Sequence, residues 1–502
     1  MSEIRKKGLL SAFWIYIGFA IGALNTFLFA RNGFFNPQDY GLATGLIQIG
    51  LLLSSFSALG CYGLLYKFFP YYQRRLSENK NDLVSLTLFI ATVGFTLVAV
   101  LGIFAQPLIL KKFGGNSPEL VEYFYYSYLL AAGFLLYSIL EYQGWNLKLQ
   151  LFTNILKEVI VRLFVLLLIL FKLFGIITFA QFLLLYCFQY LFIAGVLLFY
   201  FIRNNKIHLV FKLSFVTIKF RKVILRYLAY GFTGAVVNTL RTVMDILVLS
   251  SFSGLVTAGV YTLASFVATI LQAPYRSLVS ITIPILSNAW KEKNYREINR
   301  IYKRSSINLL LFSIVIFGFI WINFEPFVFI LHLNKEFLAG KNVLLILSIA
   351  NIIEMGTGVN GQIIGTSTLW RFEFYTNIIL GVIITTLSYI LTKYYFGING
   401  PAIALLCGIV VYNFIRIYYL FKKYHFFPFT NKTLQAITVL PVIILISKGC
   451  IMYLPFYSGL VLANLVLALL FVLSILKLNL SPDVKPIVQN VSKRISSIFN
   501  KH

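Results

Sequence analysis

Charged side chains inside long apolar runs are the residues of this 502-residue chain best placed to do chemistry. A charge in hydrocarbon costs about 2.5 kcal/mol or more, so such groups usually face a bundle interior or a water-filled cavity. The set is Lys157, Arg162, Arg226, Arg241, Arg276 and Arg416, with Glu141, Glu158, Asp245 and Glu354. Because basic residues predominate in it, the set favours contact with an anionic ligand.

A polar stripe runs along the apolar segment 223–250. Its polar and small residues follow one another at intervals of three and four, which places them on one face of a helix. They are Tyr227, Gly231, Gly234, Asn238, Arg241 and Asp245. This face either packs against another helix, with Arg241 paired to Asp245, or lines a hydrophilic cavity. We favour the cavity, since packing alone does not require a buried arginine, and we predict Arg241 and Asn238 as anion contacts.

The other basic residues have local alternatives. Arg276 follows a proline, which kinks a helix, and it either lines the same cavity or extends to the headgroups. Glu158 and Arg162 have the spacing of an i, i+4 salt bridge. Arg416 and Arg226 lie close enough to the predicted cytoplasmic surface to extend toward it.

Two further segments carry polar groups that could face a cavity. Asn25 is the strong polar group of segment 8–30, which contains no acid. Segment 342–366 is rich in glycine, which favours either a hinge beside Glu354 or tight helix packing. A buried and unpaired Glu354 would hold a proton more tightly, so we predict it, with Asp245, as a coupling or gating group.

Enzyme motifs are absent from the sequence. The chain has no P-loop, GxSxG or HExxH, and no GxGxxG that opens a helix after a strand. Its four histidines lie singly, and its four cysteines show no CxxC spacing. We therefore expect no catalytic residue, no metal site and no cofactor, while coupling to H+ or Na+ is left open.

The elements that must position these residues are membrane helices. The chain is 59% hydrophobic and 12% charged, whereas a soluble domain is about half apolar and a quarter charged. This excludes a soluble enzyme, a disordered protein and a single-pass receptor. The apolar runs predict an all-α polytopic membrane protein with about fourteen helices. The runs are 8–30, 41–66, 83–105, 119–141, 150–171, 177–202, 223–250, 254–280, 305–331, 342–366, 373–396, 400–421, 433–455 and 457–477.

Topology accounts for most of the net charge of +27. Of the 43 Lys and Arg residues, 29 lie in segments on the side of the N-terminus, eight lie on the other side and six lie within runs. Lys and Arg collect in cytoplasmic loops, so both termini are predicted to be cytoplasmic. Nucleic acid is therefore not an expected partner.

The basic segment between the sixth and seventh runs is a natural boundary. We predict an N-terminal six-helix lobe, a basic linker, a C-terminal six-helix lobe, two additional helices and a cytoplasmic tail, at 1–202, 203–222, 223–421, 433–477 and 478–502. A loose repeat supports this division, because stretches 22–26 and 40–44 recur at 234–239 and 258–262. Such a repeat would be parallel, as in transporters built from two like halves.

Two stretches resemble a known superfamily. Asn36-Pro37-Gln38-Asp39-Tyr40-Gly41-Leu42 precedes Ser57-Ala58-Leu59-Gly60, and Tyr395-Phe396-Gly397-Ile398-Asn399-Gly400-Pro401-Ala402-Ile403-Ala404 leads to Tyr412-Asn413-Phe414-Ile415-Arg416. With fourteen evenly spaced runs, the chain resembles the O-antigen and polysaccharide (lipid-linked oligosaccharide) flippases of the multidrug/oligosaccharidyl-lipid/polysaccharide exporter superfamily.

The resemblance implies two six-helix lobes around a central cavity with alternating access. It implies a bacterial inner-membrane protein that moves undecaprenyl-pyrophosphate-linked oligosaccharide, an O-antigen or capsular repeat unit, to the outer leaflet. Membrane lipid, this glycan and polysaccharide polymerase machinery would be its partners. Arg241 and Arg276, with Asn238 and Asn25, would then contact the pyrophosphate, which suits a cationic cavity.

Three alternatives stay open. A multidrug cation exporter of the same superfamily would be expected to carry an acid in its first span, where this chain has Asn25. A peptidoglycan-precursor flippase would carry cavity arginines in that span, and these have no match here. A polysaccharide polymerase or ligase would need a large extramembrane loop, whereas the loops between runs do not exceed about 25 residues.

Overall fold

The computed structural model describes residues 3–210 and 212–481, which form helices joined by short connections, with no β-strand among them. Contacts divide the chain into two compact units, Met1–Thr262 with Thr392–Ile398, and Leu263–Leu391 with Asn399–His502. The predicted tail lies outside the described residues from position 482 onward.

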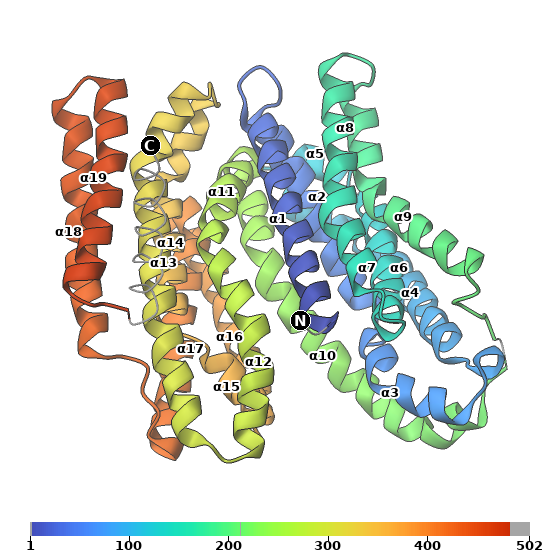
Figure 1. Ribbon diagram of the computed structural model, residues 1–502. Helices are drawn as coiled ribbons and strands as arrows, with labels where there is room; N and C mark the ends of the chain where they lie inside the picture. The colour runs from blue at the N-terminus through green and yellow to red at the C-terminus, as the bar shows by residue number, and fades with distance from the viewer. Residues whose placement is uncertain (1–2, 211, 482–502) are drawn as a thin grey trace, which may run out of the picture. The chain divides into compact units, whose positions relative to one another are not determined.

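The first unit is a bundle in which α6 packs against α2 and α9, α1 against α8, and α10 against α2 and α3 (Figure 1). Its helices are α1 (Glu3–Ala30), α2 (Pro37–Ser57), α3 (Tyr62–Arg75), α4 (Leu83–Phe113), α5 (Pro118–Glu122), α6 (Tyr126–Asn146), α7 (Gln150–Ile155), α8 (Val161–Leu173), α9 (Phe179–Arg203), α10 (Phe215–Phe252) and the first part of α11 (Gly254–Thr269). A π-helical turn, Leu156–Ile160, joins α7 to α8.

The second unit continues from α11 with helices that pack mainly on their neighbours. They are α12 (Ala273–Lys291), α13 (Tyr295–Ile330), α14 (Lys341–Gly356), α15 (Asn360–Gly365), α16 (Trp370–Leu391), α17 (Gly400–Tyr424), α18 (Asn431–Tyr453) and α19 (Phe456–Lys477). α17 packs against α14 and α16, and α18 packs against α13 and α19. α18 and α19 lie side by side in Figure 1 and share an apolar core with α13 that includes Leu310, Ile443 and Leu467.

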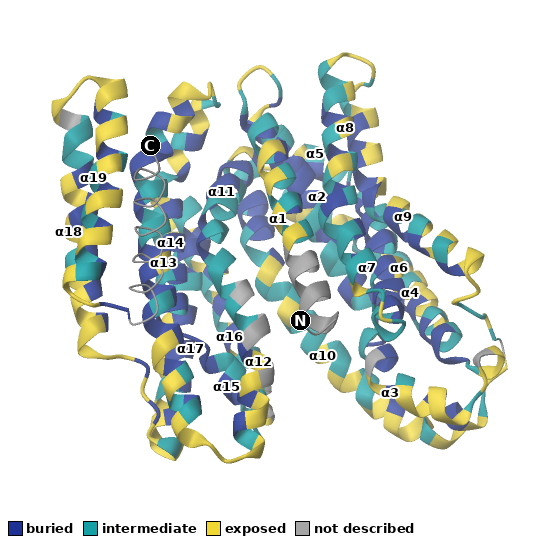
Figure 2. Cartoon of the chain, viewed as in Figure 1, coloured by how far each residue is buried: buried dark blue, intermediate teal, exposed yellow. Residues whose placement is uncertain are grey.

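The helices expose apolar side chains outward, as helices in lipid do. Figure 2 shows many exposed residues along α18 and α19, and these include Leu445, Leu465 and Leu469. Within the described residues, eleven helical stretches are long and apolar enough to cross a membrane. The prediction of an all-α, multi-pass membrane protein is therefore confirmed.

The predicted count of fourteen membrane helices is not confirmed, and three positions account for the difference. α6, over the predicted run 119–141, is not among the eleven stretches; it carries Glu141 and Gln143 and packs against α2 and α9, so it need not be apolar all round. The run 150–171 is divided by the π-helical turn. The runs 373–396 and 400–421 fall within one stretch, Arg371–Tyr424, which contains α16 and α17.

The contact units divide the chain at a different place from the predicted lobes. By contacts, residues 223–262 join the first unit, because α10 packs along α2 and α3. The predicted lobe boundary at 203–222 is a statement about sequence repeats and stays a prediction.

The two halves of the predicted repeat meet where α2 and α11 approach closely. The Asn36 N–H donates to Asp39 Oδ2 at 3.0 Å and starts α2, which brings Gly41 against α11. A Cβ on Gly41 would lie 1.9 Å from the Leu255 carbonyl oxygen, and one on Gly259 would lie 2.1 Å from the Pro37 carbonyl oxygen. Only glycine allows the two backbones this separation.

Gly41→Ala is expected to lower the unfolding temperature, because its methyl group must push α2 from α11 at a cost of about 1–3 kcal/mol. Gly115→Ala is the matched control, since a Cβ at Gly115 has no neighbour within 4 Å. Thermal unfolding of the purified protein in detergent measures both. Equal unfolding temperatures for the two variants would contradict the close approach.

Candidate functional site

The polar stripe predicted for 223–250 lies on one continuous helix, α10, and its two ends have different surroundings. In the N-terminal half of α10, Gly231 lies against Gly60, and a Cβ on Gly60 would lie 2.3 Å from the Leu228 carbonyl oxygen. Toward the other end, Asn238 is exposed and Arg241 is partly buried. The packing interpretation therefore applies to the N-terminal part of the stripe. Asn238 and Arg241 present polar groups outside the contact between Gly231 and Gly60.

Arg241 has no ion-pair or hydrogen-bond partner within the described part of the chain. Among the described residues, Arg241 makes no ion pair with Asp245, the partner that the packing alternative requires. Asp245 instead accepts a hydrogen bond of 2.8 Å from the Tyr261 hydroxyl and so links α10 to α11. No described residue therefore occupies the N–H donors of the Arg241 guanidinium.

Asn25 lies on the face of α1 that packs against α8. Its Nδ2 donates to the Arg162 carbonyl oxygen at 2.9 Å, and the side chain is buried. Beside it, a Cβ on Gly22 would lie 2.9 Å from Arg162 Nε. Arg162 Nη1 pairs with Glu158 Oε2 at 2.5 Å, which confirms the predicted salt bridge. The polar face of α1 is therefore occupied by the Arg162–Glu158 pair.

Arg276 lies in α12, but its side chain is outside the described residues. Arg241 belongs to the first contact unit and Arg276 to the second, so each is described within its own unit. Arg226 is exposed on α10, and Lys157 pairs with Glu141 at 3.3 Å. No group of three His, Cys, Asp or Glu side chains suited to a metal ion occurs among the described residues.

Arg416 is the centre of a buried polar network in the second unit, and its predicted extension toward the headgroups is wrong. The residue is only 5% exposed. Its Nη2 donates to Glu373 on α16 and to the hydroxyl of Tyr412, while its Nη1 donates to Asn360 Oδ1 at 3.1 Å. Gly361 leaves room for the guanidinium, because a Cβ there would lie 3.1 Å from it.

Glu354 joins the same network through Asn413. The Asn413 Nδ2 donates to Glu354 Oε2 at 2.6 Å, and Asn413 Oδ1 accepts from Asn360 at 2.7 Å. Glu354 is therefore hydrogen-bonded, contrary to the unpaired state considered from the sequence. The helix is interrupted just after it, between α14 and α15, where Gly358 has a φ of +69° and packs against Ser305. The glycine-rich segment thus contains both a break and tight packing.

Sequence reasoning missed Glu373, Tyr412 and Asn360 as parts of this network. One of the stretches that carry the resemblance contains Tyr412, Asn413 and Arg416. Tyr412 and Arg416 are four residues apart and so lie on one face of a helix, and this spacing was the signal in the sequence that could have indicated the network. Glu373 lies at the start of its run, 43 residues before Arg416, where an acid is expected to be solvated.

The comparisons with known proteins agree with this architecture. The model of a family described as polysaccharide biosynthesis protein matches residues 4–290. The chain belongs to this family. No curated protein matches the chain.

Solved structures of similar fold cover most of the chain. One is lipid II flippase MurJ in an inward closed conformation, with a TM-score of 0.67 and 16% identity over 94% of this chain and 99% of that one. Another is an inward-facing multidrug resistance MATE family transporter of the MOP superfamily, with a TM-score of 0.59 and 14% identity over 85% of this chain and 95% of that one. The superfamily resemblance predicted from the sequence is thus confirmed for family and fold.

Glu373→Ala is expected to destabilise the protein by about 3–5 kcal/mol, because it leaves Arg416 charged and buried without a carboxylate. The double variant Glu373→Ala with Arg416→Met removes both charges and is expected to recover most of the loss. Thermal unfolding in detergent compares the two. A double variant no more stable than the single one would contradict the ion pair as the source of the effect.

Proposed function

We propose that this protein is a transporter, and not an enzyme, that flips undecaprenyl-pyrophosphate-linked oligosaccharide from the cytoplasmic to the outer leaflet. The cargo would be an O-antigen or capsular repeat unit. Alternating access would occur between lobes 1–202 and 223–421, joined by 203–222. Membership of the polysaccharide biosynthesis family supports the pathway, and a fold similar to a lipid II flippase supports the type of transport.

The observation that supports this proposal most is that Arg241 lacks a carboxylate partner among the described residues. Three other basic residues inside apolar helices have carboxylate partners, since Lys157 pairs with Glu141, Arg162 with Glu158 and Arg416 with Glu373. Arg241, in the C-terminal half of α10, is partly buried and has no carboxylate partner among the described residues. An intramembrane cation without a counterion is costly, and binding of an anion offsets that cost.

A pyrophosphate has the chemistry to supply this counterion. Its oxygens can accept two parallel N–H bonds from one guanidinium. Asn238 lies three residues from Arg241, one turn along α10, and could donate its amide to the same group. Arg276 on α12 would be the second cation. Asn25 would reach the cargo only by exchanging its hydrogen bond with the Arg162 carbonyl oxygen for one to phosphate.

Asp245 and Glu354 are the proposed coupling or gating groups, with H+ or Na+ as the ion. Each carboxylate accepts a hydrogen bond from a neighbouring helix, from Tyr261 and from Asn413 respectively. Neutralising either carboxylate would weaken a contact between helices. These two bonds are therefore the places where ion binding could alter helix packing.

The proposed setting is the bacterial cytoplasmic membrane with both termini in the cytoplasm. The distribution of basic residues, 29 on the side of the N-terminus and eight on the other, supports this orientation. Membrane lipid and the lipid-linked glycan would be the direct partners. Polysaccharide polymerase machinery would act on the exported units.

Arg241→Ala is expected to reduce surface glycan by about tenfold or more, because a charge-assisted bond to phosphate is lost. Surface glycan is measured by lectin or antibody binding to whole cells, with membrane abundance measured in parallel. Arg226→Ala on the same helix is the matched control, since Arg226 is exposed. Normal glycan display in the Arg241 variant at normal abundance would remove Arg241 from the mechanism.

Deletion of the gene is expected to accumulate lipid-linked oligosaccharide that added glycosidases cannot reach in intact cells. This follows because a flippase acts before the glycan is exposed at the outer surface. Single repeat units accessible from outside would indicate a polymerase or ligase instead. Unchanged glycan with increased sensitivity to cationic drugs would indicate a multidrug exporter, and accumulation of peptidoglycan precursor would indicate the alternative cargo.

A further inference from the structure

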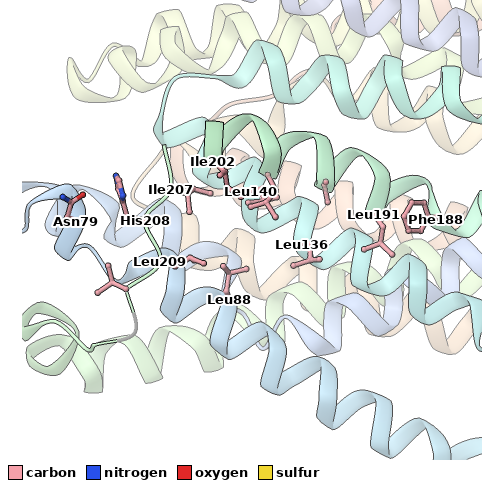
Figure 3. Close-up of a pocket in the computed structure, with 14 residues that line it drawn as sticks. Asn79, Leu88, Leu136, Leu140, Phe188, Leu191, Ile202, Ile207, His208 and Leu209 are labelled. Carbon is pink, nitrogen blue, oxygen red and sulfur yellow. The ribbon is translucent and has the colours of Figure 1, made fainter. Parts of the chain in front are cut away.

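An elongated apolar groove lies on the first unit, between α4, α6, α9 and the segment 207–210. Its volume is about 830 Å³, within the roughly 300–1,000 Å³ typical of ligand sites. Its apolar lining includes Leu88, Leu136, Leu140, Phe188, Leu191 and Leu198. Figure 3 shows Asn79 and His208 at one end of this lining and Phe188 at the other. The groove is therefore apolar along its length and polar at one end.

A smaller polar cavity adjoins that polar end. It has a volume of about 310 Å³ and shares Ile207 and His208 with the groove. Its other polar lining residues are Gln73, Ser77, Asn81, Gln143, Asn205 and Lys206. Groove and cavity together have the polarity of a lipid, with a long apolar part and a compact polar part.

Hydrogen bonds hold the segment that forms the wall between the two spaces. The Val210 N–H donates to Ser85 Oγ at 2.8 Å. A few residues later, the Ser214 N–H and the Thr217 hydroxyl donate to Asp82 Oδ2 at 2.9 Å and 2.7 Å. Because Ser85 of α4 and Asp82, the residue before α4, hold the chain at and just after the end of this wall, the site is built into the fold.

One buried unsatisfied group, on Gln143, and one exposed cation, Lys206, specify the chemistry of a ligand in the polar cavity. Gln143 is only 6% exposed, and its Oε1 is buried with no hydrogen-bond partner among the described residues. It therefore requires a donor. Lys206 contributes a positive charge, and the described residues that line the cavity include no carboxylate. The ligand should thus carry both an anionic group and a hydrogen-bond donor.

We propose that the groove and the polar cavity together bind one phospholipid whose anionic headgroup carries a hydroxyl, as phosphatidylglycerol does. Lys206 contacts the phosphate, the headgroup hydroxyl donates to Gln143 Oε1, and one acyl chain lies along the groove. The lipid enters from the leaflet on the side of the segment 203–222. Basic pockets between membrane helices bind lipid headgroups in this way.

The position of the groove favours a membrane lipid over a water-soluble ligand. Phe188 and Leu198 are both exposed, and both lie in α9, whose length and apolar composition suit a membrane span. Such residues face acyl chains in a bilayer. This site does not involve Arg241 or Arg276 and does not rest on the cargo proposed above.

Native mass spectrometry of the full-length protein, purified in detergent and mixed with equal amounts of phosphatidylglycerol and phosphatidylcholine, tests the proposal. The wild type is expected to retain one phosphatidylglycerol in preference. Lys206→Ala should lower that preference about fivefold, because one cation no longer faces the headgroup. Gln143→Leu should lower it about threefold through loss of one hydrogen bond.

Gly195→Phe tests the apolar part of the site. Gly195 lines the groove, and a Cβ there has no neighbour within 4 Å, so the ring fills the groove without displacing protein atoms at its base. We expect this variant to lose the bound lipid. Gly449→Phe on α18 is the matched control, because its Cβ also has no neighbour within 4 Å. Thermal unfolding verifies that both variants fold.

Several outcomes would overturn the proposal. Equal retention of the two lipids by the wild type would remove the headgroup preference. Retention of phosphatidylglycerol by Gly195→Phe at the level of Gly449→Phe would remove the groove. Unchanged preference in Lys206→Ala and Gln143→Leu would mean that the polar cavity holds water only. Displacement by an equal amount of a polyprenyl phosphate would assign the groove to the tail of the cargo.

Discussion

Polar groups inside a membrane must find their partners within the protein, and this constraint explains most of the interior of the bundle. Arg162 lies against Gly22 and pairs with Glu158, while Arg416 lies against Gly361 and pairs with Glu373. In both places a glycine leaves the space for a guanidinium, and a carboxylate supplies its counterion. Satisfying a charge in hydrocarbon therefore needs helix spacing as well as a partner, because a bulky neighbour would displace the planar group.

The same need for close spacing explains the contact between the two sequence repeats. Gly41 and Gly259 hold corresponding positions in the stretches 40–44 and 258–262, and each glycine lies against the other helix. Thr44 and Thr262, also corresponding positions, meet at 3.4 Å between their hydroxyl oxygens. The weak repeat seen in the sequence is thus accompanied by a reciprocal contact in the structure. A contact of this kind is what two like segments related by approximate two-fold symmetry would make.

The sequence predicted local features well and long-range contacts poorly, for physical reasons. Apolar periodicity located the helices, and i, i+4 spacing predicted the Glu158–Arg162 pair, because both depend on neighbouring residues. Arg416 looked able to reach the membrane surface, since nothing nearby in the chain reveals that Glu373 covers it. The grouping of α10 with α2 and α3 depends on packing between segments that are far apart in the sequence, and a local sequence pattern does not reveal such contacts. The apolar pattern also predicted an ordinary membrane span at α6. Because α6 packs against α2 and α9, it does not need apolar side chains on every face.

Two of the groups that the described residues leave without a hydrogen-bond partner are the ones that the proposals assign to ligands. Arg241 on α10 and Gln143 on α6 both keep capacity unused by the described residues, but they differ in what they need. A guanidinium offers donors and charge and so selects an anion, whereas the buried Gln143 oxygen selects a donor. An anionic cargo would satisfy the first group, and a hydroxyl-bearing lipid headgroup beside Lys206 would satisfy the second. The two proposals, of a transported ligand and of a resident one, apply the same rule that a polar group in a membrane needs a partner.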